Sequence, residues 1–228
     1  MGFRLESIVP WGRSFDEYVS MFALTDGELN QRILGCGDGP AGFNAALTRR
    51  GGRVTSIDPL YCFTAEEISR RISETYATVI QQTNQNRDAF TWNSIASVEE
   101  LGRIRMAAMN SFLEDFESGR KEGRYIAGEL PVLPFADGAF EISLTSHLLF
   151  LYSNRLSADF HLQALNEMLR VSREARIFPL LTLEGESSPY LQRTQDYFRN
   201  RGYSVNIRPV AYEFQRGGNV MLVIKSQL

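Results

Sequence analysis

The sequence predicts an α/β fold with a mostly parallel sheet that is flanked by helices and ends in an antiparallel C-terminal hairpin. Three observations support this prediction. Short apolar stretches alternate with amphipathic helical stretches along the chain. A glycine-rich segment, GCGDGPAG, separates the first apolar stretch from the helical pattern after it. The last two apolar stretches are joined only by QRGG, a link short enough to require antiparallel pairing.

The N-terminal part of the chain predicts a helix followed by one strand–helix–strand unit. The helix is expected over residues 14–30, with Ser14 as its N-cap. A strand begins at residues 32–34 and runs into the glycine-rich segment. The next helix is expected from Pro40, and a second strand over residues 53–57. This spacing is typical of a right-handed parallel crossover.

Residues 64–122 are too long for a simple crossover, which needs about 12–25 residues. They contain two helical patterns, TAEEISRRISETYATVIQQ and VEELGRIRMAAMNSFLEDFESG. We therefore expect a helical insertion within a single domain that covers residues 1–228. Methionine and aromatic residues at helical spacing favour packing against the sheet. Because the insertion leaves the sheet at its ligand-binding edge, a lid over the substrate is the second interpretation.

The rest of the chain continues the alternation. The expected elements are strands at 124–127 and 140–145, a helix at 157–172, a strand at 175–181, a helix at 190–201, and strands at 204–214 and 219–225. The charged residue Arg216, in the link between the last two strands, is expected to be a solvated loop residue.

Composition excludes several classes of function. The 228 residues include 24 Lys and Arg against 27 Asp and Glu, and this net charge of −3 argues against a protein devoted to nucleic acid. No apolar run approaches the length of a membrane span, and the first ten residues lack the layout of a signal peptide. Two cysteines form neither a disulfide framework nor a metal cluster. We expect a cytoplasmic protein without metal, membrane or nucleic-acid partners.

The glycine-rich segment is the strongest functional signal. Gly37, Gly39 and Gly42 have GxGxxG spacing, and Asp58 follows the next strand, 21 residues after Gly37. Glycines let the backbone approach a ligand closely, and an acid at the tip of the second strand can accept hydrogen bonds from both hydroxyls of a ribose. The pattern predicts a ribose-containing cofactor.

Three segments, RILGCGDGPAGF, VTSIDPLY and GELPVLPFADGAFEISLTSHLLF, resemble the class I S-adenosylmethionine-dependent methyltransferases over most of residues 30–228. The resemblance implies a Rossmann-like methyltransferase sheet, S-adenosylmethionine as cofactor, and methyl transfer to a small or medium-sized acceptor molecule. It implies Asp58 as the ribose acid and Glu129 as the acid beside the adenine. The cofactor-binding residues it implies are Gly35, Cys36, Gly37, Asp38, Gly39, Asp58, Pro59, Glu129, Leu130 and Ser146.

The sequence departs from that family in one respect. The family usually has an acid near the end of the first strand, where this chain has Gly35 or, one register earlier, Ile33. Asp38, inside the loop, is a candidate to compensate, and a solvated turn residue is the alternative. We expect the loss of the acid to weaken cofactor binding by about 1–3 kcal/mol.

Two residues after the fourth expected strand are candidates for contact with the reacting groups. His147 lies at the carboxyl edge of the sheet, where a histidine can act as a base, although it can also simply cap the next helix. Tyr152 ends an apolar run beside the same edge and is a candidate substrate contact, with burial in the core as the alternative.

Two other functions stay open at this point. A nicotinamide-dependent oxidoreductase is supported by the literal GxGxxG and Asp58, but the C-terminal hairpin replaces the second half that a dinucleotide fold needs. A catalytically inactive binding protein that kept the methyltransferase fold is supported by the missing first-strand acid.

Overall fold

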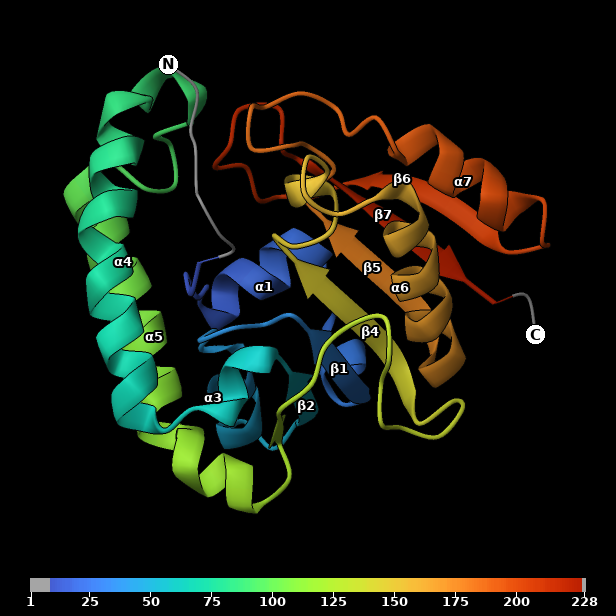
Figure 1. Ribbon diagram of the computed structural model, residues 1–228, viewed down its shortest axis with the longest axis horizontal. Helices are drawn as coiled ribbons and strands as arrows, with labels where there is room; N and C mark the ends of the chain where they lie inside the picture. Colours follow the sequence, from blue (N-terminus) through green and yellow to red (C-terminus); the bar gives the residue numbers. More distant parts are fainter. Residues whose placement is uncertain (1–8, 227–228) are drawn as a thin grey trace.

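The computed structural model describes residues 9–226 and contains a seven-stranded mixed sheet between two layers of helices (Figure 1). The strands lie in the order β3-β2-β1-β4-β5-β7-β6. They are β1 (Arg32–Cys36), β2 (Arg53–Ile57), β3 (Tyr125–Ile126), β4 (Phe140–Ser146), β5 (Ser172–Phe178), β6 (Ser204–Pro209) and β7 (Val220–Lys225). All neighbours pair in parallel except β7, which is antiparallel to both β5 and β6. The predicted Rossmann-like fold class is confirmed.

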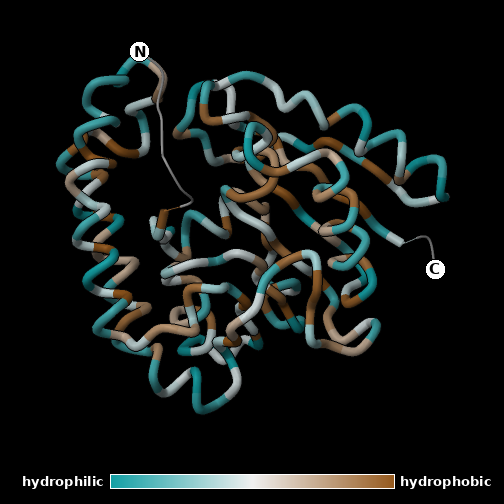
Figure 2. The backbone as a smooth tube through the Cα atoms, viewed as in Figure 1, coloured by the Kyte–Doolittle hydropathy of each residue, from teal (hydrophilic) through white to brown (hydrophobic). Residues whose placement is uncertain are grey.

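The helices divide between the two faces of the sheet. They are α1 (Phe15–Phe22), α2 (Asp26–Leu29), α3 (Phe43–Arg49), α4 (Ala65–Gln85), α5 (Val98–Lys121), α6 (Ala158–Val171) and α7 (Leu191–Arg199), with short 3₁₀ turns η1 (Pro59–Cys62), η2 (Arg87–Ala89) and η3 (Phe150–Tyr152). Alternation along β7 shows the division, because successive strand residues point to opposite faces. Val223 packs with Phe43 of α3 and Tyr18 of α1, whereas Leu222 packs with Leu165 of α6 and Phe198 of α7. Figure 2 shows the apolar strands enclosed by helices with hydrophilic outer surfaces.

Residues 64–122 hold α4 and α5, which run side by side along one side of the molecule (Figure 1). Thr64 begins α4 with a capping box that pairs its side chain with Glu67. Ile68 and Ile72 of α4 pack with Phe112 of α5 in a buried aromatic cluster. The cluster joins the helix pair to the edge of the sheet.

Several element boundaries differ from the expectation. The helix expected over residues 14–30 is two helices, because Ala23 adopts a left-handed conformation (φ 46°) and Thr25 starts α2 with its own capping box. The helix expected from Pro40 begins at Phe43, because the preceding residues complete the glycine-rich loop. Strand β5 starts and ends three residues earlier than expected, and Pro179 follows its last residue.

The link between β6 and β7 is longer than QRGG, because β6 ends at Pro209 and leaves ten residues before β7. This link is bonded to the loop that follows α4. Thr91 N–H donates to Phe214 O (2.8 Å), and Thr91 Oγ1 donates to Glu213 O (2.7 Å). Arg216 is an exposed loop residue, as expected, and its guanidinium also donates to the carbonyls of Asp88 and Phe90. We call these two segments, residues 86–92 and 212–217, the loop clasp.

Two searches of residues 9–226 gave negative findings. No helix there is long and apolar enough to cross a membrane. No group of three or more His, Cys, Asp or Glu side chains is arranged to hold a metal ion in the same residues. Residues 1–8, to which the sequence argument about a signal peptide refers, lie outside the described range.

Candidate functional site

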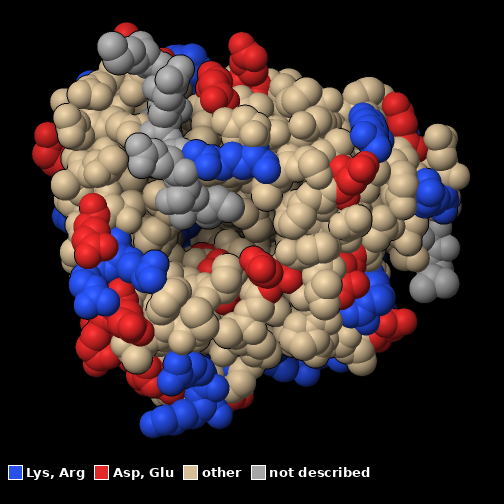
Figure 3. Space-filling model, viewed as in Figure 1, with Lys and Arg blue, Asp and Glu red and all other residues tan. Residues whose placement is uncertain are grey.

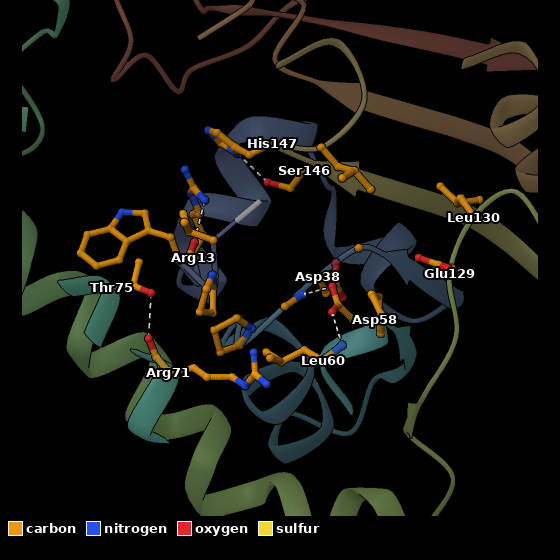
Figure 4. Close-up of a pocket in the computed structure, with 18 of the residues that line it drawn as sticks. Arg13, Asp38, Asp58, Leu60, Arg71, Thr75, Glu129, Leu130, Ser146 and His147 are labelled. Carbon is orange, nitrogen blue, oxygen red and sulfur yellow. Dashed lines mark hydrogen bonds between the residues drawn. The ribbon is translucent and has the colours of Figure 1, made fainter. Parts of the chain in front are cut away.

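A cavity of about 520 Å³ lies at the carboxyl end of the parallel strands, where loops after β1, β2, β3 and β4 meet (Figure 4). We call it the main cavity. In the space-filling view a hollow opens near the centre of the molecule, with acidic atoms at its edge (Figure 3). The predicted site residues that line the main cavity are Gly37, Asp38, Gly39, Asp58, Pro59, Glu129, Leu130, Ser146 and His147.

Three predicted residues do not border the main cavity. Gly35 and Cys36 lie within β1, and the Cys36 side chain is fully buried on the face of the sheet that packs against α6. Tyr152 is buried in η3 and borders a neighbouring cavity instead. The predicted role of Gly35 and Cys36 in cofactor binding stays a prediction, and both belong to the strand beneath the loop.

The glycine-rich loop turns sharply at the cavity floor. Gly37 and Gly39 have positive φ angles of 68° and 53°, which favour glycine. A Cβ atom on Gly37 would overlap the side chain of Leu148. The loop is tied to β2, because Gly37 N–H donates to Ile57 O (2.9 Å) and Gly39 N–H donates to Asp58 Oδ2 (2.8 Å). A side chain at position 37 is thus excluded by Leu148, and the backbone conformation at position 39 favours glycine.

Asp58 follows β2 and faces the main cavity. Its Oδ1 also accepts the N–H of Leu60 (2.8 Å), so two backbone donors fix the carboxylate. Burial raises the pKa of Asp58 to about 6, and nearby Glu129 adds to the rise, against the two backbone hydrogen bonds that lower it. Each carboxylate oxygen has a second lone pair, which leaves Asp58 able to accept further hydrogen bonds from a ligand.

The Asp38 carboxylate lies over Gly35, one of the two positions at which the sequence lacks the expected acid. A Cβ atom on Gly35 would overlap the Asp38 carboxylate, which is thus folded back over the end of β1. The carboxylate accepts hydrogen bonds from Tyr18 Oη (2.8 Å) and Ser56 Oγ (2.6 Å). Burial raises the pKa of Asp38 to about 6, although both hydrogen bonds lower it. Asp38 is a fixed part of the cavity wall and not a solvated turn residue.

Residues before α1 form a wall that sequence reasoning missed. The segment crosses the glycine-rich loop so closely that a Cβ atom on Gly12 would overlap the Pro40 carbonyl, and Gly42 N–H donates to Arg13 O (2.9 Å). Arg13 lines the main cavity, and burial, with repulsion by Arg105, lowers its pKa to about 10. The glycine at position 12 was the only local signal of this close approach.

Helix α4, part of the insertion for which a lid over the substrate was the second interpretation, supplies another wall, although none of its residues was predicted individually. Arg71, Glu74 and Thr75 line the main cavity, while Ile68 and Ile72 face the protein interior. The Arg71 guanidinium lies over the ring of Phe63, 3.9 Å from its centroid. The spacing of these residues on one helix face is consistent with both core packing and an enclosing role for the insertion.

His147 lies directly after β4 with a left-handed backbone (φ 54°). Its ring Nδ1 lies 2.8 Å from Ser146 Oγ, a contact that is drawn as a dashed line in Figure 4. The backbone N–H of His147 donates to Phe178 O (2.7 Å). Burial, together with the charges of Arg13 and Arg105, holds the pKa of His147 well below its usual range. The imidazole is therefore neutral near pH 7.

A small cavity of about 100 Å³ lies beside the main cavity, and His147 and Arg13 border both. Val9 and Trp11, before α1, also border both cavities. The other walls of the small cavity come from the two insertion helices, η3, the loop clasp and the loop after β5. These are Val79, Thr83, Leu101, Arg105, Leu151, Tyr152, Phe90, Phe214, Gln215 and Leu183. The two cavities therefore meet at the carboxyl end of β4.

A buried ion pair supports the small cavity. Arg105 is 1% exposed, and its Nη1 donates to both carboxylate oxygens of Glu17 (2.5 and 2.6 Å). Tyr212 Oη also donates to Glu17 (3.0 Å). Burial opposes ionisation of Glu17, but the charge and hydrogen bonds of Arg105 hold its pKa below the ordinary value. Glu17 is thus fully engaged by its partners.

Comparisons with known proteins agree with this architecture. The chain is 36% identical over 222 residues to the uncharacterized protein MJ0045 of Methanocaldococcus jannaschii, covering 97% of each chain. Among solved structures it is similar to magnesium protoporphyrin IX methyltransferase (ChlM) from Synechocystis PCC 6803 with bound SAM, with a TM-score of 0.50, 9% identity, and coverage of 93% of this chain and 78% of that chain. It is also similar to the PH0226 protein from Pyrococcus horikoshii OT3, with a TM-score of 0.47, 10% identity, and coverage of 87% and 82%. No family model matches the sequence.

The first of these solved structures shares the arrangement of the sheet and helices, while the archaeal relative is similar along nearly the whole sequence. The chain therefore has the fold of the class I S-adenosylmethionine-dependent methyltransferases and belongs to the same family as MJ0045.

Proposed function

We propose that the protein is an S-adenosylmethionine-dependent methyltransferase that acts on a small or medium-sized acceptor. The observation that carries the proposal is the main cavity, in which a glycine floor and the carboxylates of Asp38, Asp58 and Glu129 meet at the carboxyl end of the sheet. Four acidic residues and two arginines line it, which suits a ligand with a net positive charge. S-adenosylmethionine supplies an electrophilic methyl group on a positively charged sulfur.

The residues present fit this cofactor. Asp58 would accept the ribose hydroxyls, and Glu129 with Leu130 would lie beside the adenine. Gly37 and Gly39 would let the methionine part approach the backbone, and Asp38 would place a negative charge near its ammonium group. The carboxylate over Gly35 thus supplies what the first strand lacks.

His147 is the proposed base for an acceptor that must lose a proton. Its imidazole borders the main cavity and is neutral near pH 7, so it can accept a proton, and its lowered pKa makes it a weaker base than an exposed histidine. Ser146 would orient the ring through its hydrogen bond to Nδ1. Positioning of the two reactants and exclusion of water account for the rest of the rate enhancement.

A nicotinamide-dependent oxidoreductase is the second candidate, favoured by GxGxxG and Asp58. The antiparallel β6 and β7 stand where a second mononucleotide-binding half would continue the parallel sheet. An inactive binding protein was favoured by the missing strand acid, and the position of Asp38 weakens that argument.

Calorimetric titration tests the proposal directly. The purified protein is titrated with S-adenosylmethionine and S-adenosylhomocysteine, with NAD and NADP as controls. Micromolar binding of the two sulfur compounds alone is expected. Binding of a nicotinamide cofactor in their place supports the oxidoreductase, and silence for all four ligands overturns the proposal.

A further inference from the structure

The two neighbouring cavities differ in charge. The main cavity is bordered by four acidic residues. The small cavity is bordered by Arg13 and Arg105, and no Asp or Glu of residues 9–226 lines it. A molecule with a negative charge is therefore favoured in the small cavity over the main one.

The charge of Arg13 has no carboxylate partner within ion-pair distance in the described part of the chain. Its Nη1 donates to the Trp11 carbonyl (2.6 Å), and its buried Nε has no hydrogen-bond partner there. Arg105 is paired with Glu17, yet its Nε is also buried without a described partner. Since an unpaired buried cation is costly, the pair of arginines is suited to a ligand that brings an anionic group.

The remaining walls define the body of such a ligand. Phe90 and Phe214 stack with their ring centroids 4.8 Å apart, and Val79, Leu101 and Leu183 complete an apolar lining. The volume of about 100 Å³ admits only a compact molecule. His147 faces both cavities, so a group held here lies next to the main cavity.

We propose that the small cavity binds the methyl acceptor, and that this acceptor is a compact apolar molecule carrying a carboxylate or a similar anionic group that pairs with Arg13 and Arg105. The proposal rests on the proposed methyltransferase function. An anion at Arg13 could also come from the methionine carboxylate of the cofactor, so the experiment uses protein already saturated with S-adenosylhomocysteine.

The experiment titrates the saturated full-length protein with benzoate, and with benzamide and benzylamine as neutral and cationic compounds of similar size. Benzoate is expected to bind at least about tenfold more tightly than either. Arg13→Met and the charge-balanced double variant Glu17→Gln/Arg105→Met are each expected to weaken benzoate binding about tenfold. Arg103→Met removes an exposed charge from α5, the helix that carries Arg105, and is expected to leave the affinity for benzoate unchanged.

Val79→Phe fills the small cavity without touching the main one, and it should abolish benzoate binding while S-adenosylhomocysteine affinity is kept. Thermal unfolding of each variant verifies the fold. The inference is overturned if benzamide or benzylamine binds as tightly as benzoate, or if benzoate does not bind. It is also overturned if Val79→Phe binds benzoate with unchanged affinity. Competition between benzoate and S-adenosylhomocysteine would also overturn it, by assigning the anion to the main cavity.

The two proposals fail separately. If S-adenosylhomocysteine binds and benzoate does not, only the acceptor inference is lost. If S-adenosylhomocysteine does not bind, the methyltransferase proposal is lost whatever benzoate does.

Discussion

The carboxylate of Asp38 fills the space that a side chain on Gly35 would need. One residue thus lacks a side chain so that another, three positions later, can place its carboxylate over the end of β1. Tyr18 and Ser56 hold that carboxylate through hydrogen bonds. The pair explains how a chain without a first-strand acid still has a negative charge at this point of the cavity.

Gly35→Ala should therefore destabilise the protein by about 1–3 kcal/mol, because the new methyl group displaces a buried, hydrogen-bonded carboxylate. Urea unfolding measures the change. Gly27→Ala is the matched control, since nothing lies within 4 Å of a Cβ atom there. Equal stability of the two variants would show that Asp38 moves aside freely.

Asp58→Asn should weaken S-adenosylhomocysteine binding by about 1–3 kcal/mol, or roughly fivefold to 150-fold, because a charged acceptor of the ribose hydroxyls is lost. Calorimetry gives the affinity. Asp137→Asn is the control, because the Asp137 side chain is 82% exposed. This variant should bind S-adenosylhomocysteine with the affinity of the wild type. An unchanged affinity in Asp58→Asn would remove Asp58 from the site.

Cofactor affinity should depend on pH near the raised pKa of Asp58, about 6. Ribose hydroxyls donate to the ionised carboxylate, so binding lowers this pKa. Affinity is then nearly complete above about pH 7 and falls as the pH drops through 6, and Asp58 alone contributes about a tenfold loss between pH 7.5 and pH 5. Asp38, with a pKa of about 6, acts in the same direction. Asp58→Asn should make the profile shallower and leave the part due to Asp38, and a profile unaltered by that change would contradict the prediction.

His147→Asn should leave S-adenosylhomocysteine affinity within about threefold of the wild type, since Asn tolerates the left-handed backbone at this position. With an acceptor that yields activity, kcat should fall by about a hundredfold or more if His147 removes a proton. Steady-state kinetics measures this loss. Unchanged kcat would leave His147 as a structural residue at the end of β4.

The loop clasp should loosen when Arg216 is shortened. Arg216→Ala removes the donors to the Asp88 and Phe90 carbonyls, so amide hydrogens of residues 86–92 and 212–217 should exchange faster. Hydrogen exchange followed by mass spectrometry measures the rates. Arg193→Ala removes an exposed arginine paired only with exposed Asp159 and should have no effect on those segments.

The features that local pattern encodes were predictable from sequence. Strand identity, the glycine-rich loop and Asp58 follow from hydrophobic runs and from the spacing of glycines and an acid. The break at Ala23 was missed because both sides of it are helical, although Thr25 and Glu28 carry the spacing of a capping box that starts a second helix. The end of β6 was also missed, because the loop that follows it is fixed by the distant residues of the clasp.

The arginines of the site could not be assigned from sequence for a different reason. Arg13 enters the cavity only because the backbone at Gly12 packs on Pro40, and Arg105 is placed by an ion pair with Glu17, 88 residues away. Such placement depends on how distant helices and strands pack together, and the local spacing of residues carries no information about that packing. The roles of Tyr152 and His147 stay predictions, but the structure puts both on walls of adjoining cavities.

The loop clasp joins residues that are far apart in sequence, and this affects the order in which the two cavities can form during synthesis. Thr91 and Glu213 are 122 residues apart in sequence, so their bond forms only after most of the chain has been synthesised. Every residue of the main cavity lies before position 161, whereas the small cavity also requires Leu183, Phe214 and Gln215. On the ribosome, the nascent chain therefore contains every wall of the main cavity well before the small cavity can close.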